Sequence, residues 1–480
     1  MVESDWATEE MASARLADKR LDKRLTQVLF ALSERPNASI AAACGGRNET
    51  MAAYRLFENP KVDYKKVMAS HETMTLQRVK QQKQVLFVQD TTELNVTRPE
   101  QQVVGAGPMD SGARRGAFLH LMEAFTPDGT PLGAAWSEVW ARKEPDLSQT
   151  RAQRKYANVS KPIEKKESFR WLQGLRQTRS IAEQAPGVHC ICIGDSEADI
   201  FQLFQEPRGN GNMDWLFRGC QERNTEDGEG QVTGKLPAEL LVNPVLFTHE
   251  IDVRSRKSLI ASDKSARRVT RKGRKAKMEV RAKRVTLCAP LYTEFPSVDV
   301  NVVWVRETNP PAGEEPIDWI LLTTLPIDTL EQVNEIIQHY TVRWMIEVFF
   351  RVLKFGCRVE SRRFEYLDRL LPCVAIYMIV AWRTLYLVRL GRSCPDINCE
   401  AAFEPSEWKS IWMVSFKQPP PAIPPRLSEM LRLIGQLGGF IYTNSGSDVP
   451  GPHTTLLGLQ RMHDFAIAWD TFGPGAKSAR

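Results

Sequence analysis

The sequence predicts a mixed α/β protein with helical segments at both ends. From Val85 to Arg218, short apolar runs typical of strands alternate with helical stretches, in the order strand, strand, strand, helix, strand, helix, strand. Residues 1–70 and 391–480 instead show the apolar spacing of amphipathic helices. A chain of 480 residues with 42% hydrophobic and 25% charged residues has the composition of a globular protein of several domains, which excludes a disordered chain.

The N-terminal segment, residues 1–70, is expected to be a small helical unit. Arg15–Leu32 has helical periodicity, and Gly45-Gly46 is a plausible end for a short helix that follows. Asn48 can cap the next helix, which would run to Phe57. Short helices joined by a glycine turn fit a DNA-binding module, and they fit any other small helical bundle equally well.

The middle segment contains the expected strands of the core. Pro127-Asp-Gly129 is a turn signal between two strand-like runs, which predicts a hairpin. The predicted elements are strands at 85–90, 118–125, 132–140, 188–193 and 215–218, with a helix at 168–184. Residues from about 225 to 330 form an insertion rich in strands, including the alternating run at 298–302 and the run at 319–323.

Two long helices are expected after the insertion, at Glu331–Phe355 and Phe364–Leu390. The apolar run Leu370–Trp382 is too short to span a membrane and predicts a buried helix. Proline-rich Pro419–Pro425 reads as a linker before two more amphipathic helices. The acidic N-terminal ten residues lack the apolar centre of an export signal. We therefore expect no membrane partner and a cytoplasmic protein.

The net charge of +6 is concentrated in one part of the chain. Residues 254–284 hold 14 Lys or Arg and 2 acidic residues, whereas the remaining residues sum to −6. Such a segment is either a solvated basic loop or an arm that follows a nucleic-acid backbone. Its centre contains the candidate DNA-binding residues Arg271, Lys272, Arg274 and Lys275.

Two acidic residues are expected where strands end. Asp90 follows the apolar run from Val85, and Asp195 follows the run from Val188. An acid at the carboxyl end of a strand faces the crevice in which α/β sheets bind ligands. Taken alone, either acid could instead be an edge-of-core residue or a helix N-cap.

A third acid lies on the long helix after the insertion. Tyr340, Arg343, Glu347 and Lys354 are spaced by 3, 4 and 7 residues, which places them on one narrow stripe of a continuous helix. Apolar residues fill the opposite side and are expected to pack on the core. The stripe by itself fits a solvated, salt-bridged helix face as well as a functional one.

The cysteines and histidines carry little functional signal. Nine cysteines, an odd number, are scattered along the chain, which fits reduced thiols better than a disulfide framework. Cys190 and Cys192 lie two residues apart without a second pair at metal-ligand spacing. His120 and His189 fall in predicted strands and are read as core or edge residues.

Three motifs together resemble the DDE transposases of the insertion-sequence-four family. The Tyr340, Arg343, Glu347 and Lys354 spacing matches the family's Tyr-Arg-Glu-Lys signature, and Asp90-Thr-Thr92 and Asp195-Ser-Glu-Ala-Asp199 resemble its two other acidic motifs. The resemblance implies a ribonuclease-H-like core with a β-rich insertion. It also implies three domains: a DNA-end-binding domain at 1–70, a catalytic domain at 71–390 and a helical dimerisation domain at 391–480.

The resemblance also implies roles for individual residues. Asp90, Asp195 and Glu347 would bind two Mg²⁺ ions, for which Mn²⁺ can substitute, because hard cations prefer carboxylate oxygens. Asp199 is a rival to Asp195, and Glu93 a lesser rival to Asp90. The expected DNA contacts are Tyr340, Arg343 and Lys354 on phosphates, Arg218 in the active site and Trp319 stacked on a flipped base, although Trp319 could be a core residue, as we expect for Trp215 and Trp304.

The implied activity is cut-and-paste transposition in a bacterial, nucleoid-associated setting. A homodimer would bind the terminal repeats of a mobile element, cleave them through a DNA hairpin and join the 3′ ends to target DNA. Two alternatives stay open: a related nuclease that cuts without joining, and a silent copy that binds ends as a repressor. A glycosidase with paired carboxylates would not explain the basic residues beside Glu347.

Overall fold

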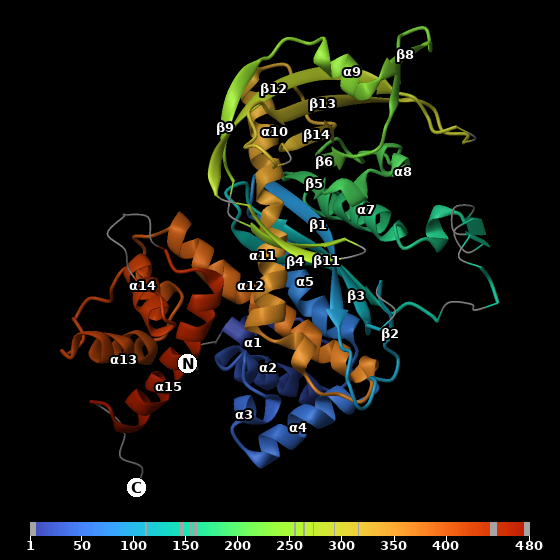
Figure 1. Cartoon of the computed structure of the whole chain (residues 1–480). Helices are drawn as coiled ribbons and strands as arrows, with labels where there is room; N and C mark the ends of the chain where they lie inside the picture. The colour runs from blue at the N-terminus through green and yellow to red at the C-terminus, as the bar shows by residue number, and fades with distance from the viewer. Residues whose placement is uncertain are drawn as a thin grey trace. The chain divides into compact units, whose positions relative to one another are not determined.

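The protein is described by a computed structural model, which divides by its internal contacts into two compact units (Figure 1). It describes residues 6–474 except 111–112, 145–147, 151, 154–155, 158–160, 254–255, 263–264, 272, 292, 315 and 442–448. The first unit contains residues 1–160 and 344–480, and the second contains residues 161–343. The three predicted domains do not coincide with these units, because both helical ends cluster with the first strands in the first unit.

The N-terminal helices of the first unit are α1 (Trp6–Glu10), α2 (Lys19–Glu34), α3 (Ile40–Cys44), α4 (Arg47–Glu58) and α5 (Tyr64–Lys80). The helices α2, α3 and α4 form largely as predicted, whereas α1 and α5 were not predicted. The expected start at Arg15 is wrong, because Asp18 caps α2 by accepting the backbone N–H of Arg20. Gly45 ends α3 with φ +74°, as expected, but Gly46 rather than Asn48 is the N-cap of α4.

Four strands of the first unit form an antiparallel group. They are β1 (Gln84–Asn95), β2 (Gly107–Pro108), β3 (Arg115–Phe125) and β4 (Pro131–Trp140), and β3 pairs with each of the others. The expectation that the first strand ends at Asp90 is wrong. β1 continues to Asn95, because its polar second half pairs with β3 and the Thr91 hydroxyl bonds Nδ1 of His120 at 2.8 Å.

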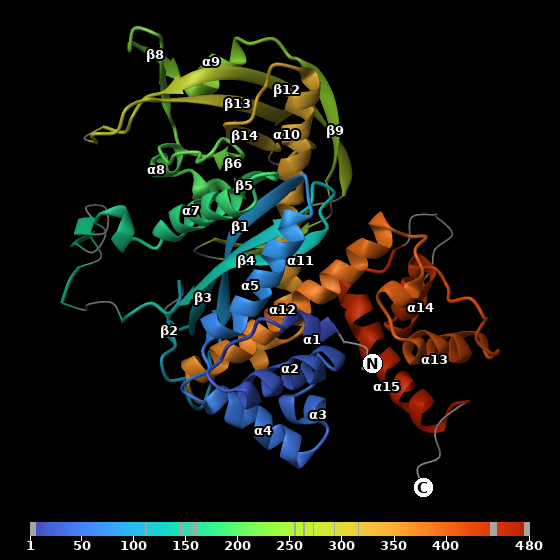
Figure 2. The same ribbon diagram turned by 180° about the vertical axis from the view of Figure 1, so that it is seen from behind.

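The remaining helices of the first unit include one long apolar helix (Figure 2). This helix, α12 (Leu367–Ser393), contacts α5, α2 and β4. In its most apolar stretch of 18 residues, 83% is buried inside the protein. It is thus a core helix, as predicted, although longer at both ends than its apolar run. The others are α11 (Trp344–Arg351), α13 (Pro405–Phe416), α14 (Leu427–Leu437) and α15 (Pro452–Phe472); α13 was not predicted.

The second unit is built on a mixed sheet in the order β5-β6-β14-β13-β12-β7-β8, with β9 also paired to β12. Only β5 and β6 are parallel, and the other pairs are antiparallel. Its helices are α7 (Phe169–Gln184), α8 (Phe201–Phe204), α9 (Leu236–Leu241) and α10 (Leu330–Val342). Its strands are β5 (His189–Gly194), β6 (Met213–Gly219), β7 (Asn224–Glu226), β8 (Val232–Lys235), β9 (Phe247–Val253), β10 (Arg256–Ser262), β11 (Ser265–Arg271), β12 (Arg274–Leu287), β13 (Val298–Glu307) and β14 (Asp318–Thr323).

The predicted fold class, mixed α/β with helical N- and C-terminal regions, is confirmed. Along the chain, three long antiparallel strands are followed by a helix and then by a parallel pair, in the predicted order. The insertion is rich in strands, as expected, and precedes the helix that carries Tyr340.

A buried ion pair ties α1 to the first unit. Glu10 is 3% exposed and accepts hydrogen bonds from Arg78 at 2.9 and 3.1 Å, with Nδ1 of His71 2.5 Å away. Nε2 of His71 accepts the backbone N–H of Ala134 at 2.9 Å, so the ring proton lies on Nδ1, facing Glu10. Burial raises the pKa of Glu10, but His71 and Arg78 together lower it from 4.5 to about 2.

We expect Glu10→Gln to lower the free energy of unfolding by about 3–5 kcal/mol at pH 7, because it leaves Arg78 without its charge partner. Since the folded-state pKa of Glu10 is depressed, its contribution is complete above pH 4.5 and is lost as the pH falls toward 2. Urea unfolding at pH 7 and pH 3 measures both effects. The exposed neighbour Glu9→Gln is the control, and equal effects of the two variants would contradict the prediction.

Candidate active site

The second unit presents Asp195 directly after strand β5, as predicted. The strand is buried to its last residue, Gly194, and Asp195 then caps a short 3₁₀ turn by accepting the backbone N–H of Glu197 at 2.8 Å. A Cβ atom on Gly194 would lie 2.5 Å from that of Ala198. Glycine is therefore required for this turn to fold back closely on the strand that carries Asp195.

Arg218 lies beside Asp195 on the neighbouring parallel strand. The last paired residues of the two strands are Gly194 and Phe217, and Asp195 and Arg218 are the residues that follow them. Both side chains thus belong to the carboxyl end of a parallel pair, where open α/β sheets bind ligands. The Arg218 guanidinium donates to the backbone carbonyl of Asp318 at 3.0 Å, which fixes it against β14.

Trp319, Tyr340 and Arg343 join this group in the second unit. Arg218 is paired with Leu321, so Trp319, two residues earlier, lies on the same face of the sheet as Arg218. The Trp319 and Tyr340 rings meet edge to face at 5.3 Å, and the Arg343 guanidinium lies 5.9 Å from the Tyr340 ring. Burial raises the pKa of Tyr340, Arg343 and Arg218 oppose the shift, and Asp195 adds to it.

These contacts bring together five predicted site residues from separate segments of the sequence. An acid, two guanidinium groups, a phenol and an indole come from four elements of one unit. Tyr340 is 4% exposed and packs on Trp319, which argues against the alternative of a solvated helix face at this residue.

Asp90 and Glu347 both belong to the first unit. Asp90 lies in the middle of β1, and Glu347 lies on α11, which contacts β1. Both residues are partly exposed, in contrast to the fully buried run of β1 that precedes Asp90. The Asp90 carboxylate accepts the backbone N–H of Thr91 at 2.7 Å.

The helix that was expected to run unbroken from Glu331 to Phe355 is interrupted twice. At Arg343, which separates α10 from α11, the backbone N–H bonds the carbonyl of Tyr340 in a tighter turn. Val352–Gly356 is then a π-helical turn, closed by the bond from Cys357 N–H to the Val352 carbonyl. Such turns are frequent at functional sites. The two irregular turns therefore rotate the Lys354 side chain around the helix axis, away from the position it would have on a uniform α-helix.

Lys354 lies among charged side chains of the first unit. Burial lowers the pKa of its ammonium group, Glu360 and Glu93 raise it, and Arg114 lowers it. Glu93 is held by Arg114 through two bonds of 2.6 and 3.1 Å. Glu93 is thus engaged in an ion pair with Arg114.

Asp199 is likewise engaged by protein groups. Its side chain is fully buried and accepts the backbone N–H groups of Cys220 and Gln221, each at 2.7 Å, and the guanidinium of Arg223. The structure therefore favours Asp195 over Asp199 as a ligand. Within the described part of the chain, no three His, Cys, Asp or Glu residues form a ready metal cluster, so the metal site stays a prediction.

Other residues have the structural roles expected of them. Trp215 is buried and stacks on Phe204 and Phe217, and Trp304 is 3% exposed and donates to Asp318 at 2.6 Å. His189 pairs with Asp214, and the buried His120 bonds Thr91 and Gln89. All nine cysteines are free thiols, as predicted.

The described residues of the basic segment 254–284 lie mostly in strands β10 and β11 and in the first part of β12. Arg271 ends β11, and Lys272 lies outside the described residues. Arg274 is held by Glu307 through two bonds of 3.0 Å and also pairs with Glu314, whereas Lys275 is exposed. Arg281 and Lys283 also have acidic partners. The segment has a net charge of +12, from 14 basic and 2 acidic residues. Ion pairs within the second unit thus neutralise part of this charge.

We expect the triple substitution of Arg271, Lys272 and Lys275 by Gln to reduce the slope of log K against log salt for DNA binding by roughly 2–3, because each neutralised phosphate contact contributes about 0.9. Fluorescence anisotropy at several salt concentrations measures the slope. Arg274→Gln is the matched control, since its charge is already balanced and its slope should hardly change. An unaltered slope in the triple variant would show that these side chains are solvated and do not contact DNA.

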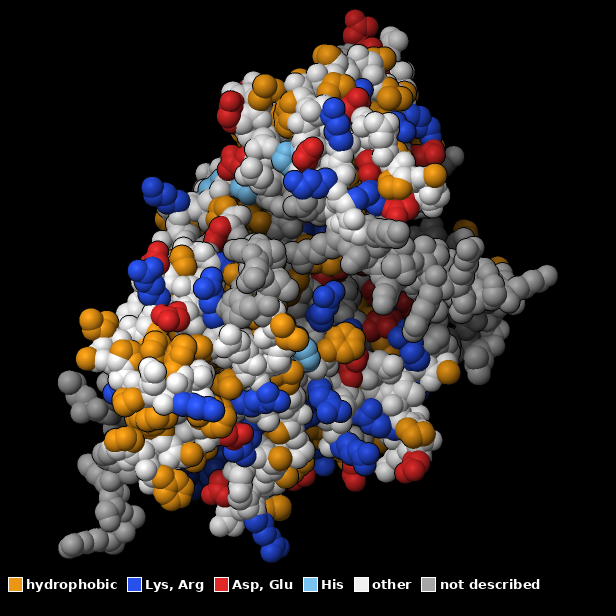
Figure 3. Space-filling view, turned by 60° about the vertical axis from the view of Figure 1, so that its left-hand side comes forward, with side chains coloured by type: hydrophobic (Ala, Val, Ile, Leu, Met, Phe, Trp, Pro, Cys, Tyr) orange, Lys and Arg blue, Asp and Glu red, His pale blue; other side chains and the backbone are white. Residues whose placement is uncertain are grey.

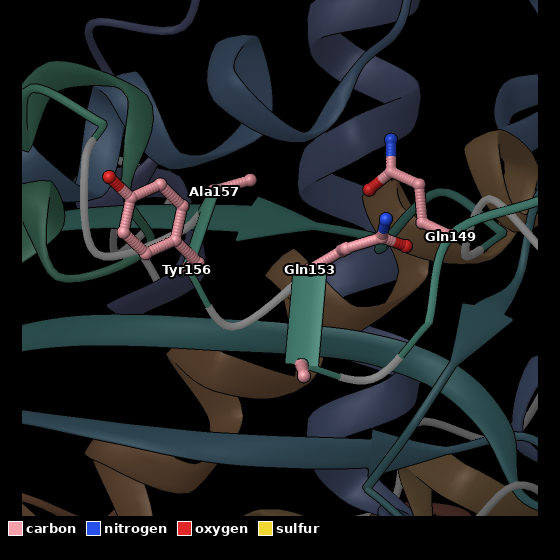
Figure 4. A pocket seen from close by; sticks show the side chains of 5 residues that line it. Gln149, Gln153, Tyr156 and Ala157 are labelled. Atoms are coloured by element: carbon pink, nitrogen blue, oxygen red, sulfur yellow. The ribbon is translucent and has the colours of Figure 1, made fainter.

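Several interactions and a pocket near the predicted site residues could not be predicted from the sequence. The bonds from Arg223 to Asp199 and from Arg114 to Glu93 join residues 24 and 21 positions apart. A pocket of about 120 Å³ borders Asp199 and Arg223, and Ile320 and Leu322 line it from the face of β14 opposite to Trp319. Another hollow, lined by Gln149, Gln153 and Tyr156 among others, contains none of the predicted site residues (Figure 4).

Comparison with known proteins matches three families in succession. Residues 3–62 match the family described as "Transposase DNA-binding", residues 166–372 match "Transposase DDE domain", and residues 379–473 match "Transposase Tn5 dimerisation domain". Among solved structures, the piggyBac transposase in a synaptic complex with hairpin DNA is similar at 10% identity, with a TM-score of 0.37. That match covers 81% of this chain and 72% of the other.

Proposed function

Because this chain belongs to the DDE transposases and resembles the Tn5 transposase, we propose that it cuts a mobile element out of DNA and pastes it elsewhere. The observation that carries the proposal is Asp195 next to Arg218 at the end of a parallel strand pair, with Tyr340, Trp319 and Arg343 around them. An acid beside two guanidinium groups suits a phosphodiester, because the guanidinium groups neutralise the phosphate.

We propose that Asp90, Asp195 and Glu347 together hold two Mg²⁺ ions, with Mn²⁺ as a substitute. The donor set fits hard cations, since it consists of three partly exposed carboxylates. When bound, such ions would activate the attacking water and stabilise the leaving oxygen. The basic groups of Arg218, Arg343 and Lys354 would orient the phosphates for in-line attack.

The proposed reaction has four steps. Water attacks the phosphodiester at the element's end and releases a 3′-OH. That 3′-OH attacks the opposite strand, which forms a hairpin and frees the flanking DNA. A second water opens the hairpin, and the regenerated 3′-OH attacks a phosphodiester of target DNA. Trp319 would stack on a base flipped out while the hairpin forms.

We propose that a homodimer pairs the two terminal repeats. The match to a dimerisation family covers residues 379–473. Hydrophobic side chains gather over the C-terminal helices in Figure 3, and Val414, Phe416, Ile467 and Phe472 are among the exposed ones. The N-terminal helices would bind the repeats, consistent with the DNA-binding match. We expect the protein to act in the bacterial cytoplasm, associated with the nucleoid.

A strand-transfer assay tests the proposal. Pre-cleaved element ends carrying a free 3′-OH are incubated with a supercoiled plasmid and Mg²⁺, and joined products are separated on a gel. The proposal predicts concerted joining of two ends to one plasmid. A parallel reaction with uncut ends and a gel-shift assay interpret a failure to join. Cleavage of uncut ends without joining would indicate a nuclease, and binding without cleavage would indicate a silent repressor; either result would overturn the proposal.

A further inference from the structure

The loops that follow β5 and β6 are joined by a buried clamp centred on Asp199. The loop after β5 contributes Asp199, and the segment after β6 contributes the backbone N–H groups of Cys220 and Gln221 and the side chain of Arg223. Cys220 Sγ adds a contact of 3.3 Å to the Ser196 carbonyl. Every bond of the clamp thus crosses from one loop to the other.

The clamp is charged and shielded from solvent. The Asp199 side chain is fully buried, and that of Arg223 is 10% exposed. Arg223 also donates to the Asp199 carbonyl at 3.1 Å, and its guanidinium lies 5.0 Å from the Phe204 ring and 5.6 Å from that of Phe201. Both groups of the ion pair are therefore multiply bonded, which is the condition under which a buried pair holds a defined geometry.

The position of the clamp relates it to the candidate active site. Asp195 lies four residues before Asp199, and Arg218 lies two residues before Cys220. Asp195 and Arg218 follow the last residues paired between β5 and β6, so the ladder between these two strands does not reach them. Arg218 is still paired with Leu321 of β14, whereas the clamp is the next link that joins the segment after β5 to the segment after β6.

We propose that Asp199 is a positioning residue that, through Arg223 and the backbone at Cys220 and Gln221, sets the distance between Asp195 and Arg218. A carboxylate ligand and a phosphate-binding guanidinium must keep their separation to within a fraction of an ångström for the reacting groups to align. This inference rests on the proposed metal-dependent cleavage. It assigns Asp199 a role distinct from metal ligation.

The experiment compares Asp199→Asn with the wild type, Asp195→Asn and a matched control. Asp227→Asn is the control, because Asp227 also accepts two backbone N–H groups in a turn of the second unit but lies in the turn between β7 and β8. Nicking of element-end DNA is measured against Mg²⁺ concentration. Ca²⁺ affinity is measured by titration calorimetry, which needs no activity. Arg223→Gln serves as a second variant that keeps both bonds from backbone N–H groups to Asp199.

We expect Asp199→Asn to raise the Mg²⁺ concentration for half-maximal nicking by about 10-fold or more and to weaken Ca²⁺ binding similarly, as loss of groups that orient metal ligands does. Arg223→Gln should shift both values in the same direction by less, and Asp227→Asn should shift neither. Loss of folded protein alone would lower the amplitude of nicking without moving the half-maximal concentration.

Two results would overturn the proposal. If Asp199→Asn abolished nicking and Ca²⁺ binding as completely as Asp195→Asn, Asp199 would be a ligand. If both metal dependences stayed at the wild-type value in Asp199→Asn and Arg223→Gln, the clamp would have no positioning role. Failure of the wild type to nick in the same assay would refute the proposed function instead, so the two failures are distinguishable.

Discussion

Asp195→Asn is expected to lower the rate of end cleavage by about 10³-fold or more, while DNA-end binding stays near the wild-type value. The loss follows because Asn keeps the side-chain shape but removes the negative charge that a divalent ion needs. A 10³-fold loss corresponds to about 4 kcal/mol of transition-state stabilisation. Asp90→Asn and Glu347→Gln should behave alike, and their effects should not add, because the three ligands act as one unit.

Control variants exist for the Asp195 and Glu347 substitutions. Glu197→Gln changes an exposed acid two residues after Asp195, and Glu331→Gln changes an exposed acid in the first turn of α10. Nicking of labelled end DNA and a gel-shift assay measure cleavage and binding separately. Wild-type nicking by any one triad variant would remove that residue from the site, and equal losses in the controls would show that the assay reports folding.

Trp319→Ala is expected to slow hairpin formation by roughly 5- to 150-fold and to leave the first nick nearly unchanged. Stacking of a flipped base on an aromatic ring contributes about 1–3 kcal/mol, and that contribution is needed only when the second strand is attacked. Trp319 is only partly buried and meets the Tyr340 ring edge to face at 5.3 Å, so part of its surface is open to a flipped base. Denaturing gels with a labelled 3′ end resolve nicked from hairpin product over time.

Trp319→Phe is the matched variant, because it keeps an aromatic surface, and it should restore most of the hairpin rate. Trp304→Phe changes a buried indole of β13 that bonds Asp318, and it should affect stability rather than hairpin formation. An unchanged hairpin yield in Trp319→Ala would refute the flipping role. Slowing of the first nick to the same degree would point to a structural role beside Tyr340.

Local pattern predicted the elements well where one signal dominated. The turn residues Pro127-Asp-Gly129 fixed the hairpin between β3 and β4, and Gly129 has the positive φ of +83° that favours glycine. Sequence patterns predicted strand ends wrongly where pairing with a neighbouring strand outweighed local propensity. Thr91, Thr92 and Glu93 read as the end of a strand, yet they continue β1 because β3 supplies partners for them.

The candidate site was predicted residue by residue but not in its geometry. Spacing on an ideal helix placed Tyr340, Arg343, Glu347 and Lys354 on one stripe. It could not foresee the tight turn at Arg343 or the π-helical turn before Cys357, because these depend on packing. Nor could spacing foresee which basic residues have partners: Arg274 and Lys275 are neighbours in sequence, but only Arg274 meets Glu307 and Glu314.

The measurement that tests the central claim most directly is a map of nicks on DNA that flanks the protein's own open reading frame. The purified protein is incubated with this DNA with and without Mg²⁺, and 3′ termini are mapped at single-nucleotide resolution. The account predicts nicks at the two boundaries of the element, each leaving a 3′-OH, only with Mg²⁺ and only when Asp195 is intact. Nicks without Mg²⁺, nicks that persist in Asp195→Asn, or no nick at either boundary would contradict it.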